Sequence, residues 1–121
     1  METSQLDTLH AFIVRAKQAT YAGNGQKLLP PYRLDSRALQ FSEGEWAYHD
    51  SYLGENDFIG QVAVYHREKV VWTMSYFGRI LNPLGINSAE AGTIIRAGLS
   101  KMHTEGRFLG GFEHTEGDLT Y

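Results

Sequence analysis

The stretch GEWAYHDSYLGENDFIGQVAVYHREKVVWTMSYFGR, residues 44–79, decides the fold of this chain. It is rich in aromatic and β-branched residues, which favour strands. Residues 72–76 alternate large side chains with small or polar ones, which is the period-two pattern of a strand with one buried face. The core face of this strand is expected to carry Val70, Trp72, Met74 and Tyr76. The opposite face is expected to carry Val71, Thr73, Ser75 and Phe77.

Two further segments of the same stretch are predicted to be strands. Residues 58–65 are rich in β-branched and aromatic side chains, and residues 66–69 are short and charged, which indicates a hairpin. The turn type stays open, because the tight Asn-Gly or Asp-Gly pair is missing. Residues 46–52 form the third strand, and residues 53–57 connect it to the next one. The prediction is a three-stranded antiparallel β-meander.

Helical periodicity flanks this meander on both sides. Ser4 and Asp7 approximate a capping box at the start of the first helix, which is expected to end near residues 17–20. Its buried stripe is predicted to comprise Leu6, Leu9, Phe12, Ile13 and Ala16. Asn87 and Glu90 form a second capping box, and Gly106 can end that helix. Its apolar face is predicted to comprise Ala91, Ile94, Ile95, Leu99 and Met102. The fold class is therefore α+β, an antiparallel meander flanked by two helices that we expect on the same sheet face.

Composition limits the functional classes. A chain of 121 residues is the size of one domain, so residues 1–121 are expected to form a single α+β domain. The net charge of −3 and the lack of a Lys/Arg cluster argue against a nucleic-acid partner. The absence of cysteine excludes disulfides and thiolate metal sites. Neither a membrane-length apolar run nor a signal peptide is present, so a cytoplasmic location is the expectation.

Two connecting segments carry glycine, proline and polar residues. The glycines of residues 19–27 indicate a helix end followed by a turn, because the spacing fits neither a dinucleotide-binding loop nor a P-loop. The segment from Pro30 to Gln40 is predicted to be an extended, irregular crossing that leads into the first strand.

The sequence contains an internal echo. Residues 42–48 (SEGEWAY) align with residues 115–121 (TEGDLTY), matching at Glu, Gly and Tyr. The second copy is therefore expected to begin a second, incomplete meander that stops at its first strand, at the end of the given sequence. Such a strand would expose an edge. We expect either that the chain is shorter than its relatives or that Tyr121 pairs with a partner.

Several motifs in combination resemble a known family. They are ATYAG (19–23), DSYLG (50–54), FIGQ (58–61), VW-x-M-x-Y-x-GR (71–79) and GRFLGG (106–111). Nearly the whole chain resembles an uncharacterised family of small bacterial domains, some of which are fused to helix-turn-helix regulators. The resemblance implies a complete second meander, which this chain lacks, and it names no activity. Where relatives tend to have Gly-Gln-Glu, this chain has Gly60-Gln61-Val62.

The residues offer little for catalysis. The five histidines are scattered without helical pairing, so no metal site is predicted. A strained serine elbow is absent, and paired carboxylates could be built only from a geometry that the sequence does not give. No cofactor and no catalytic residue is predicted, and the balance leans against an enzyme, although an enzyme acting on small molecules stays an alternative.

A binding face is the remaining hypothesis. Asp50 shares its predicted strand face with three aromatic residues. Because an unpaired buried carboxylate is costly, Asp50 is expected to lie at a solvated end of the strand, to accept a hydrogen bond from a neighbouring donor, or to contact a ligand. We expect a non-catalytic binding or sensor module for a small polar or anionic ligand, held by Tyr21, Asp50, Tyr52, Gln61, Tyr76 and Arg79. The competing interpretations are core packing for the aromatic residues and ordinary ion pairing for Arg79. The alternative function is a protein–protein or self-association module, such as a homodimer, through Val71 and Phe77.

Overall fold

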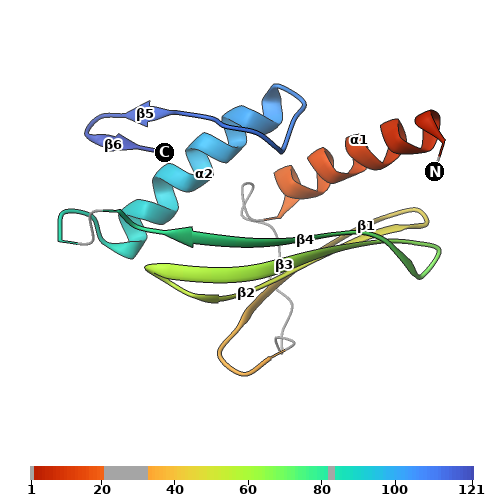
Figure 1. Ribbon diagram of the computed structural model, residues 1–121, viewed down its shortest axis with the longest axis horizontal. Coiled ribbons are helices and arrows are strands. Elements are labelled where there is room, and N and C mark those ends of the chain that lie inside the picture. The colour runs from red at the N-terminus through yellow and green to blue at the C-terminus, as the bar shows by residue number, and fades with distance from the viewer. Residues whose placement is uncertain (1, 21–32, 82–83) are drawn as a thin grey trace.

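The computed structural model describes residues 2–20, 33–81 and 84–121. The helices are α1 (Thr3–Ala19) and α2 (Ser88–Thr104), and the main strands are β1 (Arg37–Glu43), β2 (Trp46–Gly54), β3 (Asp57–His66) and β4 (Lys69–Arg79). These strands form an antiparallel sheet in the order β1-β2-β3-β4. Both helices lie on the same side of this sheet, as expected (Figure 1). The α+β class and the meander are therefore confirmed.

The sheet has one strand more than the sequence indicated. β1 occupies part of the segment that was expected to be an irregular crossing, and it pairs with β2 from Arg37↔Tyr52 to Glu43↔Trp46. Its residues Ala38 and Leu39 are buried. The segment mixes these apolar residues with charged ones and shows no clean alternation, so its strand conformation is set mainly by the backbone hydrogen bonds of β2.

A β-bulge changes the phase of β4. Val64 pairs with Trp72, but Tyr65 pairs with Val70, so Val71 is the extra residue of the bulge. Val71 therefore packs against the core, whereas Val70 is 57% exposed. The alternation of the sequence had placed Val70 on the core face and Val71 on the other face, which is the reverse of what is observed. Strict alternation fails here because it does not allow for an inserted residue. The preceding turn has positive φ at both Arg67 (51°) and Glu68 (68°), the conformation of a type I′ hairpin turn.

The core lies between α1 and the sheet. Leu9, Phe12, Ile13 and Ala16 of α1 pack against Tyr48, Val62 and Val64 of the sheet. Leu6 was expected in this stripe but is 50% exposed, because it precedes the part of α1 that covers the strands. The cap of α1 also differs from the prediction, since the Glu2 backbone amide donates to Gln5 Oε1. The cap of α2 is the predicted one, with Glu90 N donating to Asn87 Oδ1 at 2.8 Å.

The C-terminal residues form a hairpin of their own. Strands β5 (Thr115–Glu116) and β6 (Leu119–Thr120) pair antiparallel beside α2, away from the larger sheet (Figure 1). The terminal strand expected from the echo is β6, and Gly117 and Asp118 make the turn that joins it to β5. The same place in the first echo copy is the turn between β1 and β2, and the two turn glycines have φ of 60° (Gly44) and 59° (Gly117). The two copies of the repeated sequence therefore form hairpins of the same kind.

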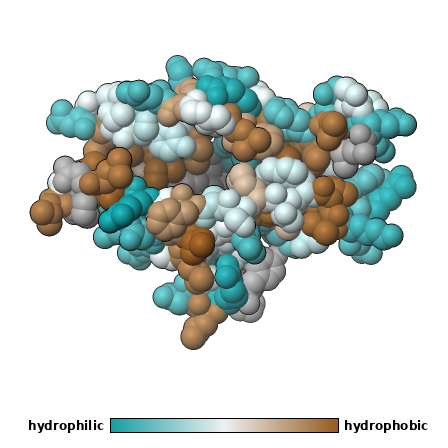
Figure 2. Space-filling model, in the orientation of Figure 1, coloured by the Kyte–Doolittle hydropathy of each residue, from teal (hydrophilic) through white to brown (hydrophobic). Residues whose placement is uncertain are grey.

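The surface carries scattered apolar side chains. Within the described ranges, the large hydrophobic residues that are at least half exposed are Leu6, Leu34, Ile59, Val70, Phe77, Leu81, Leu84 and Leu109. On the side seen in Figure 2, hydrophobic and hydrophilic areas are interspersed. Neither helix of the described ranges has the length and apolar character needed to cross a membrane.

Candidate functional site

Asp50 is a buried carboxylate on the helix-facing side of the sheet. It alternates with Tyr48 on β2 and is 6% exposed. Tyr76 of β4 donates its hydroxyl proton to Asp50 Oδ1 at 2.6 Å. Burial raises the pKa of the Asp50 carboxyl, and the Tyr76 hydrogen bond and the positive charge of Lys17 act in the opposite direction. Asp50 is thus held by a donor, one of the alternatives that the sequence left open.

Lys17 of α1 places a positive charge within electrostatic reach of this carboxylate. It follows Leu9 and Ile13 at intervals of four residues, so it continues the buried stripe of the helix. Its ammonium donates to Tyr48 Oη at 3.2 Å and lies 5.5 Å from the centre of the Tyr48 ring. Burial lowers the pKa of Lys17, and the negative charge of Asp50 raises it in part.

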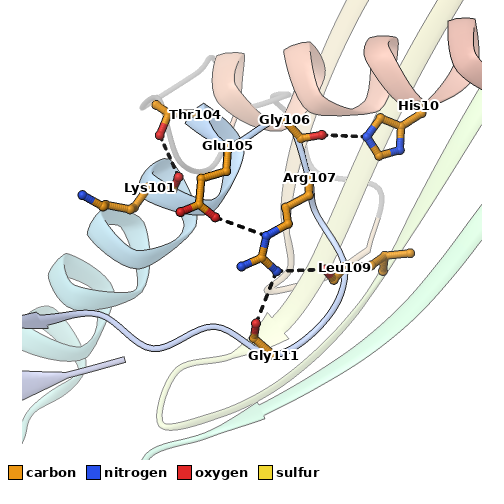
Figure 3. A network of polar contacts seen from close by, with 8 residues as sticks. All are labelled: His10, Lys101, Thr104, Glu105, Gly106, Arg107, Leu109 and Gly111. Carbon is orange, nitrogen blue, oxygen red and sulfur yellow. Dashed lines mark hydrogen bonds and ion pairs between the residues drawn. The ribbon is translucent and has the colours of Figure 1, made fainter.

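Phe108 closes the cluster from the segment that follows α2. Its ring lies 5.9 Å from Lys17 Nζ and packs edge-on to Trp72 at 5.5 Å. Figure 3 shows how this segment is held: Arg107 Nε donates to Glu105, and Arg107 NH1 donates to the carbonyls of Leu109 and Gly111. These contacts fold the backbone around one guanidinium and fix the position of the neighbouring Phe108.

The same segment is tied to α1. His10 contacts the Gly106 carbonyl at 2.7 Å through Nε2 (Figure 3), and its ring lies 5.1 Å from that of Phe108. Because Gly106 directly follows the end of α2, this hydrogen bond joins the two helices next to the cluster.

His103 is the unusual member of the group. It is 3% exposed, near the end of α2, and its Nδ1 is a buried atom without a hydrogen-bond partner among the described residues. Burial, with a smaller effect of the Lys17 charge, lowers the pKa of His103 to about 4, so the imidazole is neutral near pH 7. A buried polar atom without a partner costs free energy, and in native proteins it often marks a functional position.

The structure unites some of the predicted site residues and separates others. Asp50 and Tyr76 are hydrogen-bonded. Tyr52 lies near enough to Tyr76 to contribute to the raised pKa of the Tyr76 hydroxyl. Gln61 is exposed and lies opposite Ser51 and Ser75, on the sheet face that the helices do not cover. Arg79 is exposed and approaches Asp57 at 3.8 Å. Gln61 and Arg79 therefore do not join Asp50. Tyr21 lies outside the described residues.

Four residues of the cluster, Lys17, Tyr48, His103 and Phe108, were not among the predicted site residues. Lys17 lies near the predicted end of the first helix, where a cation suits the C-terminal dipole, but its spacing of four residues from Ile13 also places it on the buried stripe. No signal in the sequence placed Phe108, because its position depends on the loop fixed by Arg107.

The chemistry available to the cluster is that of one amine, one carboxylate, two phenols and one neutral imidazole. Among the residues that the structure describes, no three His, Asp or Glu side chains gather to hold a metal ion. A surface hollow of about 740 Å³ is lined by residues that include Glu45, His49 and Tyr65. It shares no residue with the cluster. The cluster is thus a polar layer inside the molecule, between α1, α2 and the sheet.

Comparison with known proteins gives a family without an activity. A family model described as a domain of unknown function (DUF5680) matches residues 50–121, from Asp50 to the end of the second hairpin. No curated protein and no solved structure matches the chain. The match covers the described parts of β3, β4, α2, β5 and β6, and it leaves α1 and Lys17 outside.

Proposed function

Since this chain belongs to the DUF5680 family of domains of unknown function, we propose a function from its geometry: a cytoplasmic, non-catalytic binding or sensor module for a small polar or anionic ligand. The ligand is held on the helix-facing side of the sheet, in the layer that contains Lys17, Tyr48, Asp50, Tyr76 and His103. The observation that carries the proposal is the buried His103 Nδ1, which has no hydrogen-bond partner among the described residues and lies within electrostatic reach of the half-buried Lys17.

The energetics of this layer favour binding over a purely structural role. A buried carboxylate and a buried ammonium are costly to desolvate, and well-packed apolar residues often serve stability as well or better. Groups with perturbed pKa values that converge from several elements are more typical of functional sites. Here they come from α1, β2, β4 and α2.

Charge limits the ligand. The positive charge of Lys17 and the negative charge of Asp50 compensate each other, so a polar uncharged ligand adds no unpaired charge to the layer. An anionic ligand would instead compete with Asp50 for Lys17. The uncharged ligand is therefore the simpler fit.

Native mass spectrometry of protein purified gently from its own cells tests the proposal. We expect excess mass over the 13.6 kDa chain that is lost on denaturation. The variants His103→Leu and Asp50→Asn should lose this mass, while their thermal unfolding shows that they are folded. The matched controls are Gln61→Leu and Arg79→Ala, on exposed positions outside the cluster, which should retain it. A bare chain in every preparation would contradict the proposal.

A second candidate is self-association through the uncovered sheet face. Ile59 and Phe77 are register partners on β3 and β4 and are 56% and 67% exposed. Paired apolar side chains of this kind are common at interfaces. We expect a concentration-dependent dimer in sedimentation equilibrium that Phe77→Ser abolishes. A monomer at high concentration would contradict this candidate and leave the ligand proposal untouched.

A further inference from the structure

The surface hollow of about 740 Å³ lies at the end of the sheet where two of its hairpins turn. Among its lining residues, Ser42, Ala47 and Tyr65 are register partners across β1, β2 and β3. Ala47 is one residue out of phase with the buried Tyr48, so this row lies on the sheet face that the helices do not cover. Because Ser42 and Ala47 have small side chains, they leave a depression beside the Tyr65 ring.

Two rings form one wall of the hollow. His49 and Tyr65 both line it, with ring centres 5.1 Å apart and ring planes at 56°. Both side chains are partly exposed rather than packed in the core. Burial lowers the pKa of His49 below its usual value, so the imidazole is uncharged near pH 7. The wall is therefore a neutral aromatic surface against which a flat ring can pack.

The rim of the hollow is built from two hairpin turns at the same end of the sheet (Figure 1). The Arg67 backbone amide donates to the Glu45 carbonyl at 2.9 Å, and Arg67 Nε donates to Glu45 Oε2 at 2.9 Å. His66 Nε2 lies 3.5 Å from the same carboxylate. These contacts join the β1–β2 turn to the β3–β4 turn, so the rim is in place before a ligand binds.

Glu68 is the second carboxylate of the rim. It is exposed and makes no ion pair among the described residues. Because Arg67 already pairs with Glu45, the lining as a whole keeps one negative charge, that of Glu68. The chain also has a net charge of −3, which attracts cations and repels anions. The electrostatics of the hollow therefore favour a ligand with one positive charge.

The turn that carries Glu68 has a costly backbone conformation. Arg67 and Glu68 have φ of 51° and 68°, in the left-handed region that a two-residue hairpin turn usually fills with Asn-Gly. Residues other than glycine lose free energy in this region. Conformations of this kind concentrate at functional sites, where the side chain is needed. Here the two side chains kept at this cost both line the hollow.

We propose that the hollow binds a small organic cation, an amine with an aromatic body. The ammonium of the ligand pairs with Glu68, and its ring packs against Tyr65 and His49. The volume lies within the range of small-molecule sites. Since the hollow shares no residue with the polar layer, this site is additional to the proposed function.

Titration of the full chain with benzylamine at neutral pH tests the proposal, followed by the backbone amide signals in two-dimensional NMR spectra. We expect saturable shifts at Ala47, His49 and Tyr65. Benzyl alcohol, the uncharged analogue, should bind about tenfold more weakly, since it lacks the ion pair and the cation–π contact. Benzoate should not bind. No saturable shift with benzylamine, or equal affinities for benzylamine and benzyl alcohol, would overturn the proposal.

Two variants of Glu68 separate binding from folding. Glu68→Gln removes the charge and should weaken benzylamine binding about fivefold. Glu68→Gly should weaken it as much, yet this variant should melt at a higher temperature than the wild type, because glycine suits the left-handed backbone. The matched control Asp57→Asn changes an exposed carboxylate at the other end of β3 and should bind like the wild type. Wild-type affinity in both Glu68 variants would contradict the site.

One further variant makes the test independent of the proposed function. His103 belongs to the polar layer and does not line the hollow, so folded His103→Leu should bind benzylamine as the wild type does. A loss of benzylamine binding in this variant would show that the probe enters the polar layer, and it would overturn the site in the hollow. A bare chain in native mass spectrometry together with saturable benzylamine shifts would remove the proposed function and keep this site.

Discussion

The molecule contains the same hairpin in two settings. The β1–β2 hairpin lies in a four-stranded sheet under α1, whereas β5–β6 stands beside α2 as a two-stranded sheet of its own. Each hairpin has a tyrosine two residues after the start of its second strand, Tyr48 and Tyr121. Tyr48 is 1% exposed in the core, whereas the Tyr121 ring lies against Gly98 of α2. The same sequence pattern therefore forms part of the core sheet in one place and a small peripheral hairpin in the other.

The C-terminal ends of α1 and α2 also differ in the polar contacts that they make. Counted from the first residue of each helix, Lys17 of α1 corresponds to Met102 of α2. Lys17 meets Tyr48 and the charge of Asp50, while His103 beside Met102 leaves Nδ1 without a partner in the described structure. The polar layer therefore depends on the four-stranded sheet, because its residues Asp50 and Tyr76 lie on β2 and β4.

The two tyrosines should differ most in their effect on stability. Tyr48→Ala removes a fully buried ring and should lower the free energy of unfolding by about 3–5 kcal/mol. Tyr121→Ala removes a partly exposed ring and should cost about 1 kcal/mol. Urea denaturation of both variants measures the contrast. Equal losses would show that the second hairpin belongs to the cooperative core.

The buried imidazole at the end of α2 should make stability depend on pH. The folded-state pKa of His103 is lowered from 6.5 to about 4, so the stability it contributes is present above pH 6.5 and is lost as the pH falls toward 4. The loss should reach about 3 kcal/mol. His103→Gln should remove this part of the pH dependence, and the difference between wild type and variant isolates it from Asp50, which acts in the opposite direction. Identical profiles would contradict the buried, neutral imidazole.

The turn glycines form a matched pair. Gly44 and Gly117 have nearly the same positive φ, and a Cβ would meet no atom within 4 Å at either position. Alanine should therefore cost about 1–2 kcal/mol locally at each, from the left-handed backbone alone. For Gly44→Ala the cost should appear in global unfolding. For Gly117→Ala it should appear only as faster hydrogen exchange of the His114 and Tyr121 amides, which close the second hairpin. A global effect of Gly117→Ala would argue against its peripheral role.

The smallest expected effect concerns the contact between α2 and the second hairpin. A Cβ on Gly98 would lie 2.5 Å from the Tyr121 ring, so Gly98→Ala must displace that ring. Alanine also favours the helix by about 1 kcal/mol, so the two effects nearly cancel in the wild-type background. In a Tyr121→Ala background the clash with the ring is absent and only the 3.0 Å approach to the Cβ of residue 121 remains, so Gly98→Ala should stabilise by up to about 1 kcal/mol. A double-mutant cycle measures this change, and additive effects would contradict the contact.

The parts of the fold that the sequence predicted are those where one pattern repeats. Alternation over residues 46–77 gave three of the four strands of the larger sheet, and the cap at Asn87 gave the start of α2. β1 was missed because its partner strand, rather than its own pattern, makes it a strand. The Val71 bulge was missed because one inserted residue changes the phase of everything before it.

The site was predicted less well for a related reason. Asp50 and Tyr76 were found because both follow the alternation of their strands, and their hydrogen bond joins strands separated by β3. Lys17 and His103 come from helices, and their convergence depends on how those helices pack on the sheet. Gln61 is one residue out of phase with the buried Val62, so the alternation of β3 directs it to the other face.

The up-and-down order of the larger sheet has a consequence for the speed of folding. Every strand pairs with its neighbour in sequence, and the turn between β3 and β4 has only two residues, so these contacts close short loops. Loops of this kind lose little chain entropy and form early, whereas α1 must find Tyr48 and Val64 across a long stretch of chain. Since the other two turns of the meander are equally short, we expect its hairpins to form before the polar layer, which needs α1.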